Sequence, residues 1–445
     1  MNNLKLRYGL DDIPPFWESS LQGLQWLAVI VPIAIIVGKI VADLHFDASG
    51  AQIIYMQKIF FITGAALLLQ LLWGHRLPLI IGPATILLVG IISSRGSGIH
   101  AIYTAMAIGG LFLFILSATG LFGYLKKLFT PSVVATILIL VAFTLTPMIL
   151  DLSTAASVAE LIPLHLCFVV LFVIAIFVVN RIATGFWKSA LIMWAMIAGT
   201  IIYYVVFPSD PAMTMAGGHH GIVGGFFRDM ILTPEFEPGV IISFLVCFIA
   251  LSINDLGSIY SLGGLLEPEN MPKRVTRGLM ATGALNALAG FLGVVGPVNF
   301  SLSPGVILSS RCGSRFTLIP PALALLVISF LPPAIAFLGM IPSAVVGGIM
   351  IYIMCSQIAA GLSMVIAAEG KFKFENGLVI ALPLMLSIIV SYLPQSVLNA
   401  FSPIARPVVG NGFVVGVVAV LIMEHLIFRD WGGSKRGQQE KDNEP

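Results

Sequence analysis

Asp255 is the only acidic residue in the middle of a long apolar stretch, and Asn254 lies next to it. A carboxylate at the centre of a membrane-spanning helix costs roughly 2.5–3.5 kcal/mol, so it should face a cavity or a polar partner. Asn254 carries a donor and an acceptor that suit the edge of a heterocycle. We predict a solute site here, with Asp255 as a proton-carrying or solute-binding group. The alternatives are a structural hydrogen bond for Asp255 and an interhelical contact for Asn254.

Two short apolar segments, 79–93 and 300–312, are punctuated by Gly and Pro and cannot cross a membrane as simple helices. They contain the similar sequences GPATILL (82–88) and SPGVILS (303–309). Each is expected to be extended backbone followed by a half-helix, with Pro83 and Pro304 in the first helical turns. The positive ends of the half-helices would meet at a cavity that binds a polar or anionic solute. The alternative is that these prolines only kink packed helices.

Polar residues flank both half-helices. Asn299, Ser301 and Ser303 lie at the start of the second half-helix, and Thr85 occupies the matching place after Pro83 in the first. Their side chains or backbone groups would contact the solute. Turn and capping roles are the alternative for the first three, and a hydrogen bond within its own helix is the alternative for Thr85.

The composition defines the elements that must position these residues. The chain has 445 residues, of which 58% are hydrophobic and 10% charged, with a mean hydropathy of +1.01. A soluble domain is about 25% charged, so the composition excludes that class and indicates an all-α polytopic membrane protein. We predict fourteen spans, at 22–42, 52–73, 79–93, 101–123, 131–150, 161–180, 187–207, 239–262, 277–294, 300–312, 315–333, 340–362, 376–393 and 411–428.

The basic residues predict the orientation. If the N-terminus is cytoplasmic, 18 of the 23 Lys and Arg residues fall on the cytoplasmic side, as the positive-inside rule requires. An even number of spans places both termini there, and the first apolar run does not resemble a cleaved signal peptide. We therefore expect a protein of the plasma (inner) membrane with no soluble domain at either end.

A second sequence match indicates an internal repeat. TPSVVATILIL (130–140) and IPSAVVGGIMI (341–351) follow the half-helix segments in the same order. Two halves of seven spans each would enter the membrane from opposite faces, which makes the 7+7 inverted repeat typical of secondary transporters. The predicted parts are a cytoplasmic N-terminal segment (1–21), a first repeat (22–207), an extracytoplasmic loop (208–238), a second repeat (239–428) and a cytoplasmic tail (429–445).

Several function classes have no support in the sequence. It contains no nucleophile–base pair, no Gly-rich phosphate loop and no metal-spaced cluster, so we predict neither an enzyme nor a cofactor or metal site. The four cysteines lie in or beside apolar segments and are expected to be packing residues. The basic loops reflect membrane topology, and nucleic acid is not an expected partner.

Longer stretches of the chain resemble the nucleobase–ascorbate transporter family, also called xanthine/uracil permeases. FEPGVIISFLVCFIALSINDLGS (236–258) is similar to the family's eighth span, and GLMATGALNALAGFLGVVGPVNFSLSPGVILSSR (278–311) to its ninth span and signature motif. IPSAVVGGIMI is similar to the twelfth span and LQGLQWLAVIVP (21–32) to the first. The resemblance covers essentially the whole chain.

The binding motifs depart from the family pattern in both halves. Asn254 stands where the eighth span of the family has a glutamate, Asp255 where His or Ser is common, and Ser258 where an aspartate is common, while Gly257 is kept. In the signature motif a Glu or Gln and an Asn precede the glycine. Here Leu302 and Ser303 take those two positions before Gly305. The Thr-Arg pair that closes the motif in the family is Ser310 and Arg311 here. The first span keeps Gln25 but has Trp26 where a histidine is frequent.

The resemblance implies a fold and an activity. It implies a core domain (22–123 plus 239–333) that holds the site, a gate domain (131–207 plus 340–428) and a homodimer formed through the gate domains. The expected function is secondary transport of a nucleobase-like heterocycle such as uracil or xanthine with a proton, by alternating access, with membrane lipid as the surroundings. Two alternatives stay open: an anion transporter of the sulfate or bicarbonate type, and a passive facilitator or ligand sensor.

Overall fold

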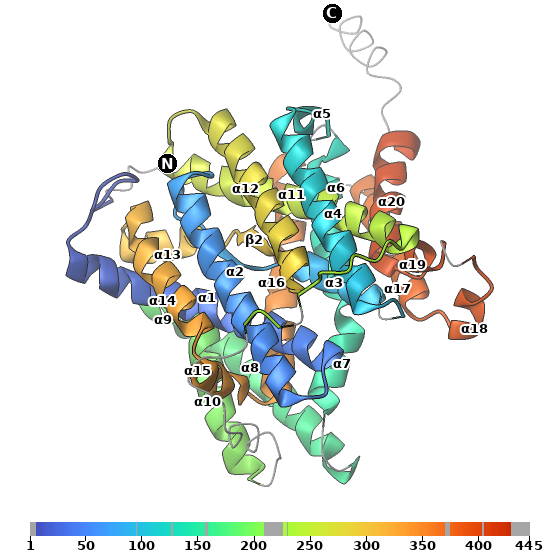
Figure 1. Cartoon of the computed structure of the whole chain (residues 1–445), viewed down its shortest axis with the longest axis horizontal. Helices are drawn as coiled ribbons and strands as arrows, with labels where there is room; N and C mark the ends of the chain where they lie inside the picture. Colours follow the sequence, from blue (N-terminus) through green and yellow to red (C-terminus); the bar gives the residue numbers. More distant parts are fainter. Residues whose placement is uncertain are drawn as a thin grey trace, which may run out of the picture.

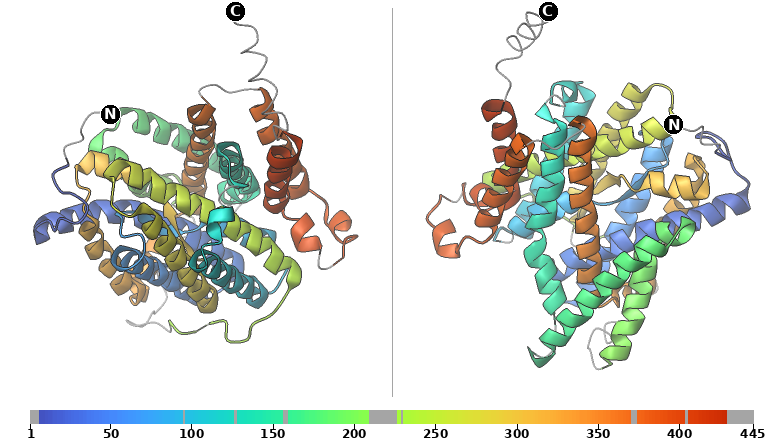
Figure 2. Two further views of the ribbon diagram at one scale, coloured as in Figure 1. Left: turned by 90° about the horizontal axis from the view of Figure 1, so that it is seen from above. Right: turned by 180° about the vertical axis from the view of Figure 1, so that it is seen from behind.

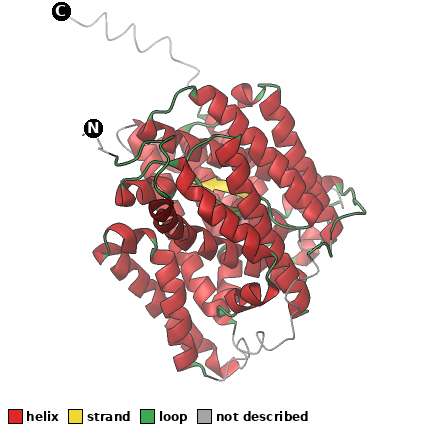
Figure 3. Ribbon diagram, turned by 60° about the vertical axis from the view of Figure 1, so that its left-hand side comes forward, coloured by secondary structure: helices red, strands yellow, loops and turns green. Residues whose placement is uncertain are grey.

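The computed structural model describes residues 6–94, 96–125, 128–155, 159–208, 226–228, 230–369, 374–402 and 405–428. Helices surround one small two-stranded sheet (Figure 1; Figure 3). The elements of the N-terminal half are α1 (Phe16–His45), α2 (Ser49–Leu72), β1 (Ile80–Pro83), α3 (Thr85–Ser93), α4 (Ile99–Ala118), α5 (Phe122–Leu125), α6 (Pro131–Thr144), α7 (Thr146–Thr154), η2 (Ala159–Leu161), α8 (Ile162–Ile182), α9 (Gly185–Ser189) and α10 (Leu191–Val206).

The C-terminal half begins after the predicted 208–238 loop, most of which lies outside the described residues, as does the predicted tail. Its elements are α11 (Pro238–Leu266), α12 (Met271–Leu292), β2 (Pro297–Phe300), α13 (Ser303–Ser310), η4 (Arg315–Leu318), α14 (Ile319–Ser329), α15 (Pro332–Gly339), α16 (Ser343–Glu369), α17 (Phe374–Ser391), α18 (Gln395–Leu398), α19 (Arg406–Val409), α20 (Gly412–Ile422) and the π-helical turn η5 (Met423–Ile427).

Local sequence sets several helix ends. Thr130 caps α6, where its hydroxyl oxygen accepts from the Val133 N–H at 3.3 Å and Pro131 opens the helix. The Asn411 side chain caps α20 by accepting from Phe413 and Val414. Gly293 follows the C-terminal end of α12 and takes a left-handed φ of 69°, which ends the helix at little steric cost.

Within the described residues, eight helices are long and apolar enough to span a membrane, and a bent pair, residues 315–329 with 332–339, makes a possible ninth. The other predicted spans overlap shorter or less apolar helices, so the count of fourteen stays a prediction. Both short segments contain the expected strand and short helix, β1–α3 and β2–α13. Pro304 lies in the first turn of α13, as predicted. Pro83 does not lie in a helix: it ends β1, because the chain stays extended for pairing up to that residue.

The contacts between elements come in pairs that correspond between the two halves. α4 packs on α12 and α2 on α14; α1 packs on β1 and α11 on β2; α3 packs on α11 and α1 on α13. The corresponding elements are α1 and α11, α2 and α12, β1–α3 and β2–α13, and α4 and α14. Replacing each element by its counterpart turns the first contact of each pair into the second. This is the packing that an inverted repeat would produce.

The contact between α4 and α12 depends on glycine. A Cβ at Gly110 would lie 2.3 Å from the Ala287 backbone nitrogen, and one at Gly283 would lie 2.5 Å from the Phe114 backbone nitrogen. Such small residues let two helix backbones touch inside a membrane protein. The tight contact holds α12, which carries part of the polar site described below.

Figure 2 shows α17 and α20 gathered with α6 at one side of the molecule, and these three helices pack on one another. The elements around the sheet meet this group through contacts of α11 with α19 and α20 and of α3 with α6. One cluster of buried apolar side chains extends from Trp26 on α1 to Met423 on η5. The division into core and gate domains remains a prediction, and these contacts define where the two groups would meet.

Candidate functional site

The two strands bring both half-helices together. β1 and β2 pair antiparallel, with Ile81 opposite Asn299 and Pro83 opposite Pro297. Beyond the pair, the Ala84 N–H donates to the Gly296 carbonyl at 2.9 Å. Because each strand leads directly into its half-helix, the N-terminal ends of α3 and α13 lie at opposite ends of the same short sheet. The strand and half-helix predicted for each segment are therefore joined through one sheet, and a solute site at the two half-helix ends stays a prediction.

Asp255 lies inside the protein and contacts no solvent, with 0% of its surface exposed. Its Oδ1 accepts from the Asn299 backbone N–H at 2.8 Å and from the Asn299 side-chain amide at 2.5 Å. Its Oδ2 accepts from the Thr282 hydroxyl at 2.7 Å. The carboxylate therefore ties α11 to strand β2 and to α12. Asp255 thus has polar partners, as expected for an acidic residue in an apolar stretch.

These bonds belong to a closed ring of buried polar groups. The Gln70 side-chain amide donates to the Thr282 hydroxyl oxygen at 3.0 Å, and the Gln70 amide oxygen accepts from the His75 N–H at 3.2 Å. His75 Nε2 lies 3.0 Å from the Asn299 amide oxygen, and Asn299 leads back to Asp255. The network thus ties α2 and the turn before β1, in the first half of the chain, to α11, α12 and β2 in the second half.

His75 acts in this ring as a neutral donor. Its Nδ1 accepts from the Leu77 N–H at 3.0 Å, so the proton sits on Nε2 and is donated to Asn299. Burial lowers the pKa of His75 to about 3, which keeps its imidazole neutral at physiological pH. Sequence reasoning missed His75, Gln70 and Thr282. Only the polar character of Thr282 and Gln70 within apolar stretches could have indicated them.

The polar groups around the Asn299 carbonyl form the next layer. Ser258 donates its hydroxyl to that carbonyl at 2.9 Å, and the Asn254 amide approaches it at 3.3 Å. The Ser258 and Ser301 hydroxyl oxygens are 2.8 Å apart. Of the predicted site residues, Asn254, Asn299 and Ser301 therefore join Asp255 in one cluster, with Asn254 only half-buried.

The start of α13 is open on one side. Leu302 is 45% exposed, and Ser301, Gly305 and Gly257 are also exposed. A Cβ added at Gly257 or Gly305 would meet nothing within 4 Å. Asn254, Ser301 and the backbone around Gly305 therefore border free space, and a solute could approach them from this side.

The remaining predicted residues are buried. The Ser303 hydroxyl oxygen accepts from the Ile80 N–H at 2.8 Å, which ties the start of α13 to β1. Thr85 begins α3 and is largely buried, and Gln25 is buried on α1, a helix that packs on both β1 and α13. Trp26 donates its indole N–H to the Thr317 hydroxyl at 3.0 Å and so points to η4.

Comparison with known proteins gives consistent relatives. The sequence model of the Permease family that covers xanthine and uracil permeases matches residues 18–396. The chain is 29% identical to the nucleobase transporter PlUacP of Paenibacillus larvae subsp. larvae, over 90% of this chain and 91% of that protein. It is 28% identical to the uric acid permease PucK of Bacillus subtilis (93% and 96% covered) and 26% identical to the xanthine permease of the same organism (93% of each).

Solved structures show the same fold at low identity. The transmembrane domain of the cyanobacterial bicarbonate transporter BicA matches with a TM-score of 0.62 at 16% identity, covering 86% of this chain and 97% of that one. The murine anion transporter Slc26a9 matches with a TM-score of 0.60 at 14% identity, covering 93% and 68%.

Proposed function

Because the chain belongs to the xanthine/uracil permease family, a family of membrane transporters and not of enzymes, we propose that it is a secondary active transporter for an oxidised purine or a similar nucleobase. The observation that carries this proposal is the polar cluster at the start of α13, where Asn254 and Ser301 border free space. An amide and a hydroxyl offer donors and acceptors that match the ring nitrogens and carbonyls of such a base. Relatives named for uric acid and xanthine support this substrate class.

We propose that Asp255 couples transport to protons. The ionised carboxylate accepts two hydrogen bonds from Asn299 through one oxygen. Protonation would weaken that acceptor and loosen β2, whose Asn299 carbonyl is held by Asn254 and Ser258 at the edge of the site. A proton could thus change the site without touching the solute. Substitution of Asp255 by Asn should abolish pH-dependent accumulation; unchanged pH dependence would contradict the coupling.

Two contacts support the proposed grouping of segments on the same side of the membrane. The Arg7 N–H donates to the Arg311 carbonyl at 2.9 Å, and both residues fall on the predicted cytoplasmic side. Lys58 donates to the Arg228 carbonyl at 2.6 Å, and both fall on the predicted outer side. Segments assigned to opposite faces would have no reason to pair in this way. We extend the proposal to cytoplasmic termini, to alternating access of core against gate, and to a homodimer through the gate domains.

A second candidate is transport of a small inorganic anion. The fold neighbours named above are anion transporters, and the exposed start of α13 carries the apolar Leu302 in place of the family's Glu or Gln. The N-terminus of a half-helix suits an anion, because its backbone N–H groups and dipole favour negative charge. Inhibition of uptake by bicarbonate or sulfate, and not by nucleobases, would favour this function.

The deciding experiment is uptake of labelled uracil, xanthine, hypoxanthine and urate into bacterial cells that lack their own base permeases, with and without a protonophore. Concentrative uptake that the protonophore abolishes supports the proposal. Uptake that only equilibrates indicates a facilitator. No uptake by protein shown to be in the membrane would reject a nucleobase substrate, and the anion panel would follow.

A further inference from the structure

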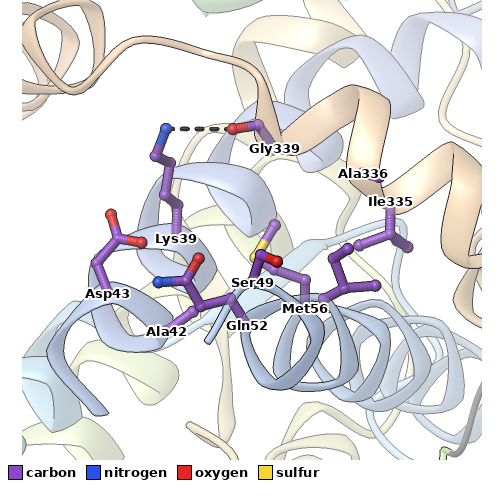
Figure 4. Close-up of a pocket in the computed structure, with 10 residues that line it drawn as sticks. Lys39, Ala42, Asp43, Ser49, Gln52, Met56, Ile335, Ala336 and Gly339 are labelled. Carbon is purple, nitrogen blue, oxygen red and sulfur yellow. Dashed lines mark hydrogen bonds between the residues drawn. The ribbon is translucent and has the colours of Figure 1, made fainter. Parts of the chain in front are cut away.

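A small cavity at the predicted outer end of α1 contains a buried lysine. The cavity is lined by Lys39, Asp43, Ser49 and Gln52 together with apolar residues of α1, α2 and α15 (Figure 4). Lys39 is 7% exposed, and its ammonium donates to the Gly339 carbonyl at 3.2 Å and to the Ile341 carbonyl. The ammonium has thus exchanged much of its water for main-chain oxygens, and it depends on them.

The two carbonyls belong to the connecting segment 334–342, which leads from the predicted core, ending at 333, into the start of the predicted gate at 340. α15 follows α14 after a bend of 98° and leads through residues 340–342 into α16. Gly339 ends α15, where helix carbonyls have no partner within the helix and the dipole favours a cation. Lys39 therefore caps this helix from α1, which belongs to the predicted core.

The carbonyl between them is held from the other domain. The Tyr204 hydroxyl, on α10 of the predicted gate, donates to the Met340 carbonyl at 2.6 Å. Three successive carbonyls of the connecting segment are thus held alternately, by the core through Lys39 and by the gate through Tyr204. The core cannot move far against the gate while both hydrogen-bonded contacts persist.

We propose that Lys39 is a latch on the connecting segment, and that it must release the Gly339 and Ile341 carbonyls for the core to move during transport. Asp43, one helical turn further along α1, is the acceptor for the released ammonium. It lines the same cavity and lies within electrostatic reach of Lys39 (Figure 4). Asp43 is exposed at this end of α1, so it offers the released ammonium an opposite charge in place of the two carbonyls. The proposal rests on the proposed alternating-access transport.

Cross-linking tests whether the latch must open. The variant Lys39→Cys/Gly339→Cys is made with the exposed Cys167 and Cys355 changed to Ser, and is treated with a cleavable bismaleimide. The matched control is Ser49→Cys/Gln52→Cys, which lines the same cavity but lies on α2 alone. We expect the first cross-link to lower the initial uptake rate at least tenfold, with recovery on cleavage, and the control to stay within twofold. A cross-linked transporter that keeps more than half its rate overturns the proposal.

Substitution of Asp43 tests the second partner. Asp43→Asn should lower the maximal uptake rate several-fold with KM within twofold, because the latch loses its alternative acceptor. Lys39→Met/Asp43→Asn should be no slower than the slower single variant, because both changes act on one ammonium. A wild-type rate for Asp43→Asn rejects Asp43 as the acceptor.

Hydrogen exchange tests the hold without any substrate. Lys39→Met should speed amide exchange in a peptide spanning 335–342 at least tenfold, while Lys39→Arg, which keeps a cation, should not, and peptides of α12 should be unchanged in both. Unchanged exchange in Lys39→Met would show that the ammonium holds nothing. This measurement decides the latch even if the wild-type chain transports none of the tested bases, so the two proposals fail separately.

Discussion

Removal of the Asp255 carboxylate should destabilise the protein in proportion to the buried donors that it leaves unpaired. Asp255→Ala leaves the Asn299 backbone N–H and side-chain amide without their acceptor, in a region that water does not reach. Each unsatisfied buried donor costs about 1–3 kcal/mol, so the two together cost roughly 2–6 kcal/mol. The Thr282 hydroxyl adds little, because it already accepts from Gln70 and can rotate.

Asp255→Asn should cost much less. The remaining amide oxygen can continue to accept from Asn299, and the new NH₂ group can donate to Thr282, whose hydroxyl oxygen accepts as well as donates. What is lost is the charge on the acceptor, worth about 1–2 kcal/mol, and relief of a buried charge offsets part of that. The expected order of stability is therefore wild type, Asn variant, Ala variant.

Thermal unfolding of the detergent-solubilised protein at fixed pH measures this order. Thr282→Val is the matched control: it removes one donor to the carboxylate and should fall between the Asn and Ala variants. An Asp255→Ala protein that unfolds within about 1 °C of wild type would refute the argument, since a loss of 2 kcal/mol shifts the Tm of a chain of 445 residues by about 2 °C. Such a result would mean that the carboxylate is not the anchor of β2.

Three further predictions concern other parts of the site and its support. His75 stays neutral in the folded protein, while an unfolded histidine takes up a proton below about pH 6.5. Folding stability should therefore fall by up to about 1.4 kcal/mol per pH unit as the pH is lowered from 6.5 to 4. In His75→Gln, which keeps a donor toward Asn299, thermal unfolding from pH 7 to pH 4.5 should lack this loss of stability, and a pH profile identical to that of the wild type would contradict the argument. Leu302→Trp fills the open side of α13 at an exposed position, so the KM for uptake should rise at least fivefold with Tm unchanged, and an unaltered KM would remove Leu302 from the solute path. Arg315 is buried and donates to Asp11 at 2.7 Å and to the Leu71 carbonyl, so Arg315→Met should lower the free energy of unfolding by about 2–4 kcal/mol. Asp11→Asn, at a carboxylate that is 60% exposed, should cost less than about 1 kcal/mol in the same unfolding assay. Equal losses would show that the salt bridge, and not the buried guanidinium, carries the effect.

Local sequence was sufficient to predict the membrane class and the unusual short segments. The hydropathy of a segment is set by its own residues, so long apolar runs identify helices such as α1 and α11 without knowledge of their neighbours. The Gly and Pro residues of 79–93 and 300–312 interrupt helix formation locally, which is why the strand and half-helix could be expected in both. The position of Asp255 in an apolar run likewise predicted that it would have a partner.

The identity of that partner was decided only by the tertiary structure. Asn299 lies 44 residues from Asp255 and 224 residues from His75, yet all three meet, because the pairing of β1 with β2 brings the turn after α2 beside strand β2. Hydrogen-bond partners at such separations depend on how closely the helices approach one another. Glycines such as Gly283 allow that close approach, and the sequence pattern does not show which helix they contact. The same reason explains Lys39: its charge within α1 was visible in the sequence, but only the packing of α15 against α1 supplies the two carbonyls that hold it.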